Sequence, residues 1–266
     1  MPIEYEKLPL SIQEQIGQKQ AKIDEIGMSN ANILLYEDMV LKVEAHQAES
    51  NHEHTMLGWL ANKLPVPEVF LSIQDQEFSY LLMSRAKGEF ACSDYWLSHP
   101  QQLVKILAQC LKMLWAVPIQ NCPYDLSLDH KLKIAEQNVL HKKYSIEDAE
   151  VGTYGDSGFQ SPEALLSWLN EHRPKVDLVF SHGDFCLPNI FIDQENISAL
   201  IDLGRSGIDD RYQDIALCYR SLKHNFSGVY SGIAYPDFNP DILFDELGMT
   251  PDYDKIRYYI LLDELF

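Results

Sequence analysis

The pattern of apolar and polar positions changes about a third of the way along the chain. Up to residue 83, short apolar runs alternate with turn residues, which is typical of an antiparallel sheet, and one longer amphipathic stretch interrupts them. Beyond residue 88, apolar positions recur at spacings of three and four, which predicts helices. An α+β fold is expected, with strands at 22–27, 32–36, 39–43, 69–73 and 78–83 and helices at 10–16, 47–62, 100–115, 128–140, 162–169, 210–222 and 253–266.

The run from Ser181 to Asp210 carries the strongest chemical signal. It reads S-H-G-D-F-C-L-P-N-I-F-I-D-Q-E-N-I-S-A-L-I-D-L-G-R-S-G-I-D-D, a polar loop followed by two short apolar strands. Protein kinases have a catalytic-loop aspartate, an asparagine five residues later and a metal-holding aspartate after the next strand. Asp184, Asn189 and Asp202 fit this order. Each alone could be a turn residue, but the whole run favours phosphoryl transfer.

These residue types suit the chemistry. The loose transition state of phosphoryl transfer needs little proton abstraction, so Asp184 is expected to orient an attacking hydroxyl and accept its proton late. Asn189 and Asp202 supply the hard oxygen ligands that Mg²⁺ prefers while it bridges nucleotide phosphates. Cys186, between two apolar residues, is interpreted as a small packing residue and not as a nucleophile.

Two motifs resemble a known family. The run Ser181 to Asp214, which ends G-I-D-D-R-Y-Q-D, and the C-terminal Y-Y-I-L-L-D-E-L-F look like the aminoglycoside 3'-phosphotransferases, antibiotic-resistance kinases with a protein-kinase-like bilobal fold. The resemblance spans most of the chain, more loosely through L-P-V-P and L-L-M-S. It implies a small antiparallel-sheet, nucleotide-binding lobe over 1–83, a hinge at 84–88 and a mainly helical catalytic and substrate-binding lobe over 89–266.

Several residues of the first lobe are expected to hold the nucleotide phosphates. Lys42 ends the third strand, and in kinase folds such a lysine pairs the α- and β-phosphates and is held by a glutamate of the next helix. The resemblance aligns Glu53 with that glutamate, while Glu49, one turn earlier, remains a competitor. Ser29 lies at the first turn, where its hydroxyl and nearby N–H groups could cover phosphates.

The hinge is expected to bind the nucleotide base. By resemblance, backbone groups of Ser84 and Ala86 meet adenine, and Met83 lies at the back of the pocket. An ordinary loop after a strand would look the same without this context. The implied cofactors are ATP and Mg²⁺, and whether GTP substitutes for ATP stays open.

Negative charge gathers at the chain's end, in Asp263, Glu264 and the Phe266 carboxylate. Such charge is unfavourable at a helix C-terminus, so it suggests a positive partner. In the resembling family, C-terminal acids hold the amines of the antibiotic while its 3'-hydroxyl faces the catalytic aspartate. Arg205 is expected to meet a phosphate or a substrate acid. The acidic stretch 145–160 is either a flap over a cationic substrate or a solvated loop.

Composition narrows the partners. The 266 residues carry a formal net charge of −19, which argues against nucleic acid and suits a cationic small-molecule substrate, although acidic cytosolic proteins are common. No apolar run reaches the roughly 20 residues of a membrane span, and no signal-peptide pattern opens the chain. Five cysteines without a C-x-x-C pair favour reduced thiols. A cytoplasmic monomer or homodimer without a membrane partner is expected.

Two alternatives stay open beside the aminoglycoside kinase. A metabolic kinase for choline, a sugar or a hydroxylated amine would share the catalytic run, and a non-catalytic nucleotide-binding module would share the fold. Departures from the family pattern bear on drug spectrum and nucleotide preference more than on the reaction. His224 and Asn225 stand where many members have an acidic pair, Leu187 where some have an aspartate, and Val40 where some have an aromatic residue.

Overall fold

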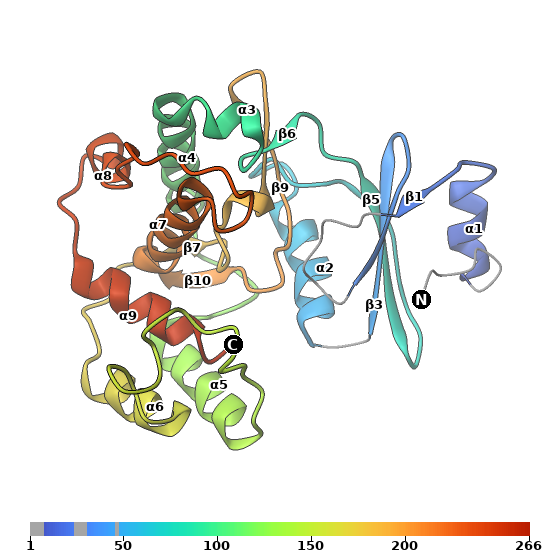
Figure 1. Ribbon diagram of the computed structural model, residues 1–266. Coiled ribbons are helices and arrows are strands. Elements are labelled where there is room, and N and C mark those ends of the chain that lie inside the picture. The colour runs from blue at the N-terminus through green and yellow to red at the C-terminus, as the bar shows by residue number, and fades with distance from the viewer. Residues whose placement is uncertain (1–7, 24–30, 46–47) are drawn as a thin grey trace. The chain divides into compact units, whose positions relative to one another are not determined.

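The computed structural model describes residues 8–23, 31–45 and 48–266, and the chain forms two compact units (Figure 1). The first comprises Met1–Glu89 and Phe191–Arg205, and the second comprises Phe90–Ile190 and Ser206–Phe266. The sequence placed one boundary at 84–88. In the structure, the segment Phe191–Arg205 also belongs to the first unit, although it follows that boundary in the sequence. The nucleotide and substrate roles assigned to 1–83 and 89–266 remain predictions.

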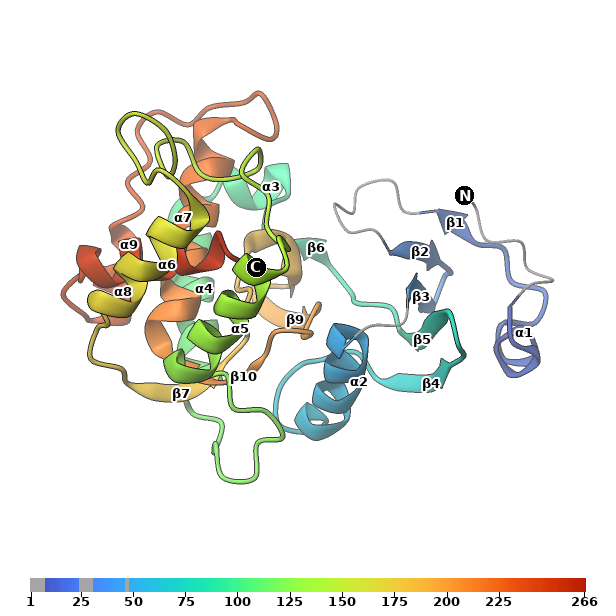
Figure 2. The same cartoon turned by 90° about the horizontal axis from the view of Figure 1, so that it is seen from below.

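In its described residues, the first unit contains a five-stranded antiparallel sheet and two helices, as the pattern of short apolar runs predicts. The strand order is β1-β2-β3-β5-β4, and α1 and α2 lie on opposite sides of the sheet (Figures 1 and 2). The elements are α1 (Leu10–Ile16), β1 (Lys22–Ile23), β2 (Asn32–Leu35), β3 (Met39–Ala45), α2 (Ala48–Leu60), β4 (Val69–Gln74) and β5 (Phe78–Ser84).

Alternation along β3 separates its core residues from its charged residue. Leu41 and Val43 are buried and belong to the same hydrophobic core as Ile12 and Ile16 of α1. Successive side chains of a strand point to opposite faces, so Lys42 lies on the other face of the sheet, away from this core. The two-residue period therefore directs the lysine toward the side of the sheet that carries α2.

A second, three-stranded sheet contains the hairpin predicted after the polar loop. It consists of β6 (Glu89–Phe90), β8 (Ile190–Asp193) and β9 (Asn196–Leu200), in the order β6-β8-β9. Gly88 has φ 80°, and a Cβ there would lie 2.1 Å from the carbonyl oxygen of Ile192. Only glycine allows the chain to pass so close to β8.

The second unit is mainly helical. Its helices are α3 (Asp94–Leu97), α4 (Pro100–Trp115), α5 (Leu128–Leu140), α6 (Pro162–Glu171), α7 (Arg211–Ser227), α8 (Ile242–Leu247) and α9 (Tyr253–Asp263), with a two-stranded sheet of β7 (Leu178–Ser181) and β10 (Gly207–Asp210). The predicted apolar face of α4 is buried, and α7 packs against α9. In α6, Ser161 caps the helix by accepting the N–H of Ala164, as its place before Pro162 predicts.

The ends of four helices differ from the prediction: α2 ends at Leu60 instead of 62, α6 continues to Glu171 instead of 169, and α7 and α9 differ as follows. Phe226 is buried and stacks on Phe238, with ring centroids 3.6 Å apart, so α7 continues past 222 to Ser227 and ends at Gly228 in the left-handed conformation. The helix α9 ends at Asp263, before the last three residues. Among the described residues, no helix combines the length and apolarity that crossing a membrane requires.

Candidate active site

The loop that follows β7 is held by one buried carboxylate. Asp214, in the first turn of α7, accepts hydrogen bonds from the Ser181 hydroxyl at 2.9 Å and from the backbone N–H groups of His182 and Gly183 at 2.9 and 3.0 Å. Burial raises the pKa of Asp214, while the His182 ring and these donors act in the opposite direction. Gly183 has φ 84°, a left-handed conformation that favours glycine. The backbone of His182 and Gly183, immediately before Asp184, is therefore fixed.

Both oxygens of the Asp184 carboxylate have a donor. The Asn189 side-chain amide donates to Asp184 Oδ2 at 2.9 Å and to the Asp184 carbonyl oxygen at 3.0 Å. The Cys186 thiol donates to Asp184 Oδ1, with sulfur and oxygen 2.9 Å apart. Burial and the neighbouring Asp184 raise the pKa of the Cys186 thiol well above its usual value, so at neutral pH it stays protonated and can donate.

The structure thus brings Asp184 and Asn189 together, as the kinase-like spacing predicts. It also gives Cys186 a contact that the sequence interpretation missed, since that residue was read as packing only. Its position between Phe185 and Leu187, both fully buried, concealed the role, because a small thiol among apolar neighbours is usually core material. The only sequence signal was its place two residues after the aspartate.

Lys42, Glu53 and Asp202 form a charged cluster within the first unit. Lys42 Nζ lies 2.7 Å from Glu53 Oε2 and 3.4 Å from Asp202 Oδ1. Burial alone would lower the pKa of Lys42, but the surrounding carboxylates, with Glu53 foremost, raise it above the usual value, so the ammonium stays charged. Asp202 has φ 60°, an uncommon conformation for a non-glycine residue and one that concentrates at functional sites.

The structure distinguishes the two candidate glutamates of α2. Glu53 is buried against Lys42, whereas the exposed Glu49 carboxylate lies 3.6 Å from Arg205 Nε. The glutamate aligned by resemblance is therefore the one in contact with the lysine. Arg205 lies beside α2 in the first unit, and its contact with a phosphate or substrate acid remains a prediction.

The residues expected at the nucleotide base lie at the end of β5. Met83 is 8% exposed. The Ser84 amide donates to the Glu68 carbonyl oxygen at 2.8 Å, so an adenine contact would have to use another backbone group of this segment, such as one of Ala86. Ser29 lies outside the described residues.

The acids of the tail already have protein partners. Asp263 Oδ2 accepts a hydrogen bond from Arg220 Nη2 at 2.6 Å, so the charge of this carboxylate is neutralised by the arginine. Glu264 Oε1 accepts the backbone N–H of Glu150 at 3.0 Å. Burial raises the pKa of Glu264 to about 7, although the Glu150 amide and Arg220 lower it.

The residues from Tyr258 to Leu265 are anchored within the second unit. Tyr258 and Tyr259 are almost fully buried on α9, and the Tyr258 hydroxyl donates to the Leu169 carbonyl oxygen at 2.8 Å. The Asn138 side chain donates to the Leu265 carbonyl oxygen at 2.9 Å, directly before the chain end. The terminal acids are thereby given fixed positions within the second unit.

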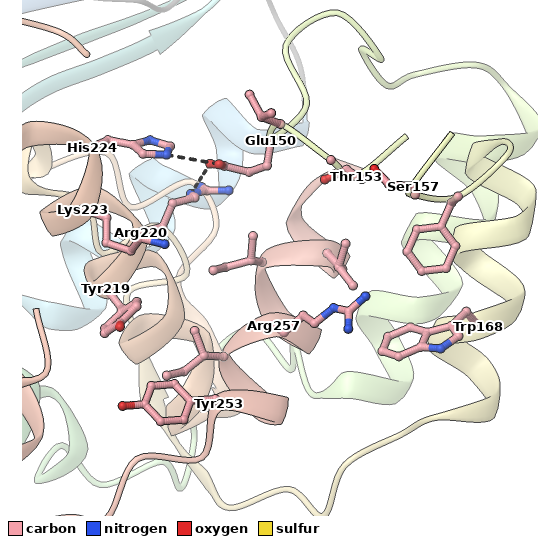
Figure 3. Close-up of a pocket in the computed structure, with 17 residues that line it drawn as sticks. Glu150, Thr153, Ser157, Trp168, Tyr219, Arg220, Lys223, His224, Tyr253 and Arg257 are labelled. Atoms are coloured by element: carbon pink, nitrogen blue, oxygen red, sulfur yellow. Dashed lines mark hydrogen bonds and ion pairs between the residues drawn. The ribbon is translucent and has the colours of Figure 1, made fainter. Parts of the chain in front are cut away.

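Glu150 ties the stretch 145–160 to α7 and, through its backbone N–H, to Glu264, which follows α9. The Glu150 carboxylate lies 3.1 Å from His224 Nε2 and 3.7 Å from Arg220 Nε (Figure 3). Sequence reasoning missed Arg220 altogether, because nothing local indicates that residues 150, 220 and 263 converge. Whether this stretch covers a substrate remains a prediction.

A divalent cation is compatible with the donors present. The Asn189 amide nitrogen is occupied by Asp184, which leaves Oδ1 as the oxygen that this side chain can offer. Asp202 offers a half-exposed carboxylate. Among the described residues, no group of three or more His, Cys, Asp or Glu side chains could hold a metal ion. Each of these two side chains by itself thus offers an oxygen of the kind that Mg²⁺ takes, and their joint binding of one ion remains a prediction.

Known proteins resemble this chain over nearly its whole length. The model of the phosphotransferase enzyme family matches residues 20–259. An aminoglycoside 3'-phosphotransferase of Enterococcus faecalis is 35% identical over 96% of this chain and 93% of that protein. One of Niallia circulans is 34% identical over 97% of each. The crystal structure of an aminoglycoside-3'-phosphotransferase of type VIII superposes with a TM-score of 0.80 at 27% identity, covering 97% of each chain.

Replacement of the bracing carboxylate Asp214 tests how the loop before Asp184 is held. In Asp214→Asn, a single amide oxygen replaces two acceptors, so at least one buried donor loses its partner, at a cost of about 1–3 kcal/mol. Urea unfolding should show that loss, and the amides of His182 and Gly183 should exchange hydrogen faster. Asp254→Asn, which removes an exposed acid on α9, serves as the control. Unchanged protection of both amides in Asp214→Asn would contradict the bracing role.

Proposed function

Because this chain belongs to the phosphotransferase enzyme family, and to its aminoglycoside 3'-phosphotransferases, we propose that it transfers the γ-phosphoryl group of ATP to the 3'-hydroxyl of aminoglycoside antibiotics and so confers resistance. The observation that carries the proposal is the Asp184 carboxylate, held by Asn189 and Cys186 on a braced loop. A non-catalytic binding module would have no need of such an arrangement. Kanamycin and neomycin, with several amines and a 3'-hydroxyl, are the type of acceptor expected.

Asp184 would act on the acceptor alcohol. Its carboxylate accepts a hydrogen bond from the 3'-hydroxyl and aims the oxygen lone pair at phosphorus. As the new O–P bond forms and the bond to the leaving ADP oxygen breaks, the hydroxyl proton passes to Asp184. Little basicity is required, because the transition state is loose and the proton moves late. Orientation is then the main contribution of Asp184, and its two donors serve that purpose.

The other residues of the kinase order would hold the nucleotide. Lys42 carries a permanent positive charge for the α- and β-phosphates, and Glu53 keeps its ammonium in place. Asn189 Oδ1 and Asp202 would hold Mg²⁺, which when bound neutralises the charge of the phosphates. ATP is the expected nucleotide, with backbone groups near Ser84 and Ala86 at its base.

Acids of the second unit would bind the amines of the antibiotic. Glu264 and the Phe266 carboxylate lie at an anchored chain end, while Asp263 is engaged by Arg220 and would act on substrate only through that pair. The net charge of −19 favours the approach of a polycation. A cytoplasmic location, where ATP is available, and a monomer or homodimer remain part of the proposal.

ATP turnover against a panel of alcohols tests the function. Kanamycin should be phosphorylated, whereas tobramycin, which lacks the 3'-hydroxyl, should not. Asp184→Asn should lower kcat at least about 100-fold, the usual contribution of a positioned base, with nucleotide affinity unchanged. Equal turnover of both drugs would move the acceptor position, transfer to choline or a sugar instead would favour a metabolic kinase, and no transfer to any acceptor would indicate a binding module.

The Cys186 thiol is expected to matter through Asp184. Cys186→Ala removes one donor to the carboxylate, and loss of a hydrogen bond to a charged group costs about 1.5 kcal/mol, so kcat should fall roughly tenfold while the KM values for both substrates stay near those of the wild type. Cys186→Ser retains a donor and should recover most of the loss. Equal kcat values for the alanine and serine variants would show that the thiol only fills space.

The pH dependence of substrate affinity should report Glu264. Its raised pKa, about 7, means that the side chain loses its negative charge as the pH falls from 8 to 6, so the KM for kanamycin should rise over that interval. Glu264→Gln lacks this titration and should show a high KM with a flatter profile. Asp254→Asn, an exposed acid elsewhere on α9, should retain the wild-type profile. Identical profiles for wild type and Glu264→Gln would exclude Glu264 as the titrating group.

A further inference from the structure

A cavity of about 500 Å³ lies within the second unit, and the proposed phosphotransfer does not account for it. The stretch 150–159, α6, α7 and α9 each contribute side chains to its wall (Figure 3). Its volume is in the range of small-molecule sites. The question is which chemistry such a cavity would accept.

One part of the lining is apolar and aromatic. Ile256, Ile260 and Leu261 of α9 contribute aliphatic surface, and Phe159 and Trp168 meet edge to face with ring centroids 5.8 Å apart. Aromatic side chains present large flat surfaces against which a planar apolar ligand can pack. A small hydrated ion has no apolar surface to bury against these side chains. The ligand should therefore have a flat apolar body.

The charged part of the lining is positive. Arg220, Lys223 and Arg257 are the cations of the lining, and Glu150 is the sole carboxylate among the lining residues. Arg220 is paired with Asp263, so Lys223 and Arg257 supply the positive charge. Glu150 is already engaged by Arg220 and His224. A locally cationic cavity in a chain of net charge −19 is the reverse of what a polyamine substrate requires.

Two of these cations have aromatic contacts and no ion pair among the described residues. The Arg257 guanidinium lies 5.8 Å from the centroid of the Trp168 ring, and Lys223 Nζ lies 6.0 Å from that of Tyr219. Both side chains are exposed, and in Figure 3 they come from different helices that border the cavity. They are therefore available to an anionic group on a bound molecule.

We propose that this cavity is a binding site for a small aromatic anion, such as an aromatic carboxylate, sulfonate or phosphate. The flat body packs against Trp168 and the aliphatic side chains of α9, and the anionic group meets Lys223 and Arg257. The cavity wall meets the acids of the tail through Glu150 and Arg220, but the proposed anion contacts, Lys223 and Arg257, form no ion pair with those acids among the described residues. The inference stands on the lining of the cavity and does not depend on the proposed phosphotransfer.

Titration of the full chain with 1-naphthalenesulfonate tests the site directly. The protein carries ¹⁵N-labelled tryptophan, and the indole N–H signal of Trp168 is assigned with Trp168→Phe. That signal should shift and saturate with the sulfonate, and 1-naphthylmethylammonium, with the same ring system and the opposite charge, should not reproduce the shift. Lys223→Gln/Arg257→Gln should weaken the sulfonate Kd roughly tenfold, because two charge-assisted contacts are lost. Both residues are exposed, so the fold should persist.

The control has the same change in charge elsewhere on the unit. Lys105→Gln/Lys133→Gln replaces two exposed lysines of α4 and α5 that do not line the cavity, and it should leave the Kd unchanged. Saturating kanamycin should also leave it unchanged. The proposal is overturned if the Trp168 signal does not saturate, if both double variants bind the sulfonate as tightly as the wild type, or if kanamycin displaces the sulfonate, which would assign the cavity to the polyamine.

Discussion

The arrangement of the second unit depends on one long, buried helix that presents charged side chains at fixed intervals. A buried polar group must find partners, because leaving it unpaired costs the full desolvation penalty. The buried Asp214 carboxylate accepts hydrogen bonds from Ser181, His182 and Gly183 in the loop after β7. These bonds fix the backbone of the H-G-D segment. About two turns further along α7, the largely buried Arg220 guanidinium is paired with the Asp263 carboxylate of α9. The loop that carries Asp184 and the residues that follow α9 are thus positioned by the same helix.

In the first unit the corresponding constraint is the two-residue period of β3. Leu41 and Val43 must face the core with α1, so Lys42 must face the other way. There it lies among carboxylates, and its charge is maintained although it is largely buried. The hydrophobic core and the position of the Lys42 charge are therefore two consequences of a single register. A slip by one residue would exchange them.

Net charge describes this protein poorly at the level of single sites. The chain is strongly acidic as a whole, yet Asp263 is neutralised by an arginine, Glu264 has a raised pKa, and cations outnumber carboxylates among the lining residues of the cavity beside Glu150. The charge that a bound ligand contacts depends on the burial and the ion-pair partners of the nearby side chains. The net charge of the protein affects only the long-range attraction of the ligand before it binds.

The sequence by itself determined the helices over 10–16, 100–115 and 128–140 and, to within two residues, the strands over 32–36, 39–43, 69–73 and 78–83. It also determined the order of Lys42, Asp184, Asn189 and Asp202, because periodicity and motif spacing are local properties of the chain. Of the strand expected over 22–27, residues 24–27 lie outside the described residues. Only the tertiary structure chose Glu53 over Glu49 as the partner of Lys42, returned 191–205 to the first unit and joined Glu150 to Arg220 and His224. It also decided that Cys186 donates to Asp184 and that Asp263 is paired. The physical reason is the same throughout: the partner and solvation of a side chain depend on residues far away in sequence, which packing brings together and no local pattern specifies.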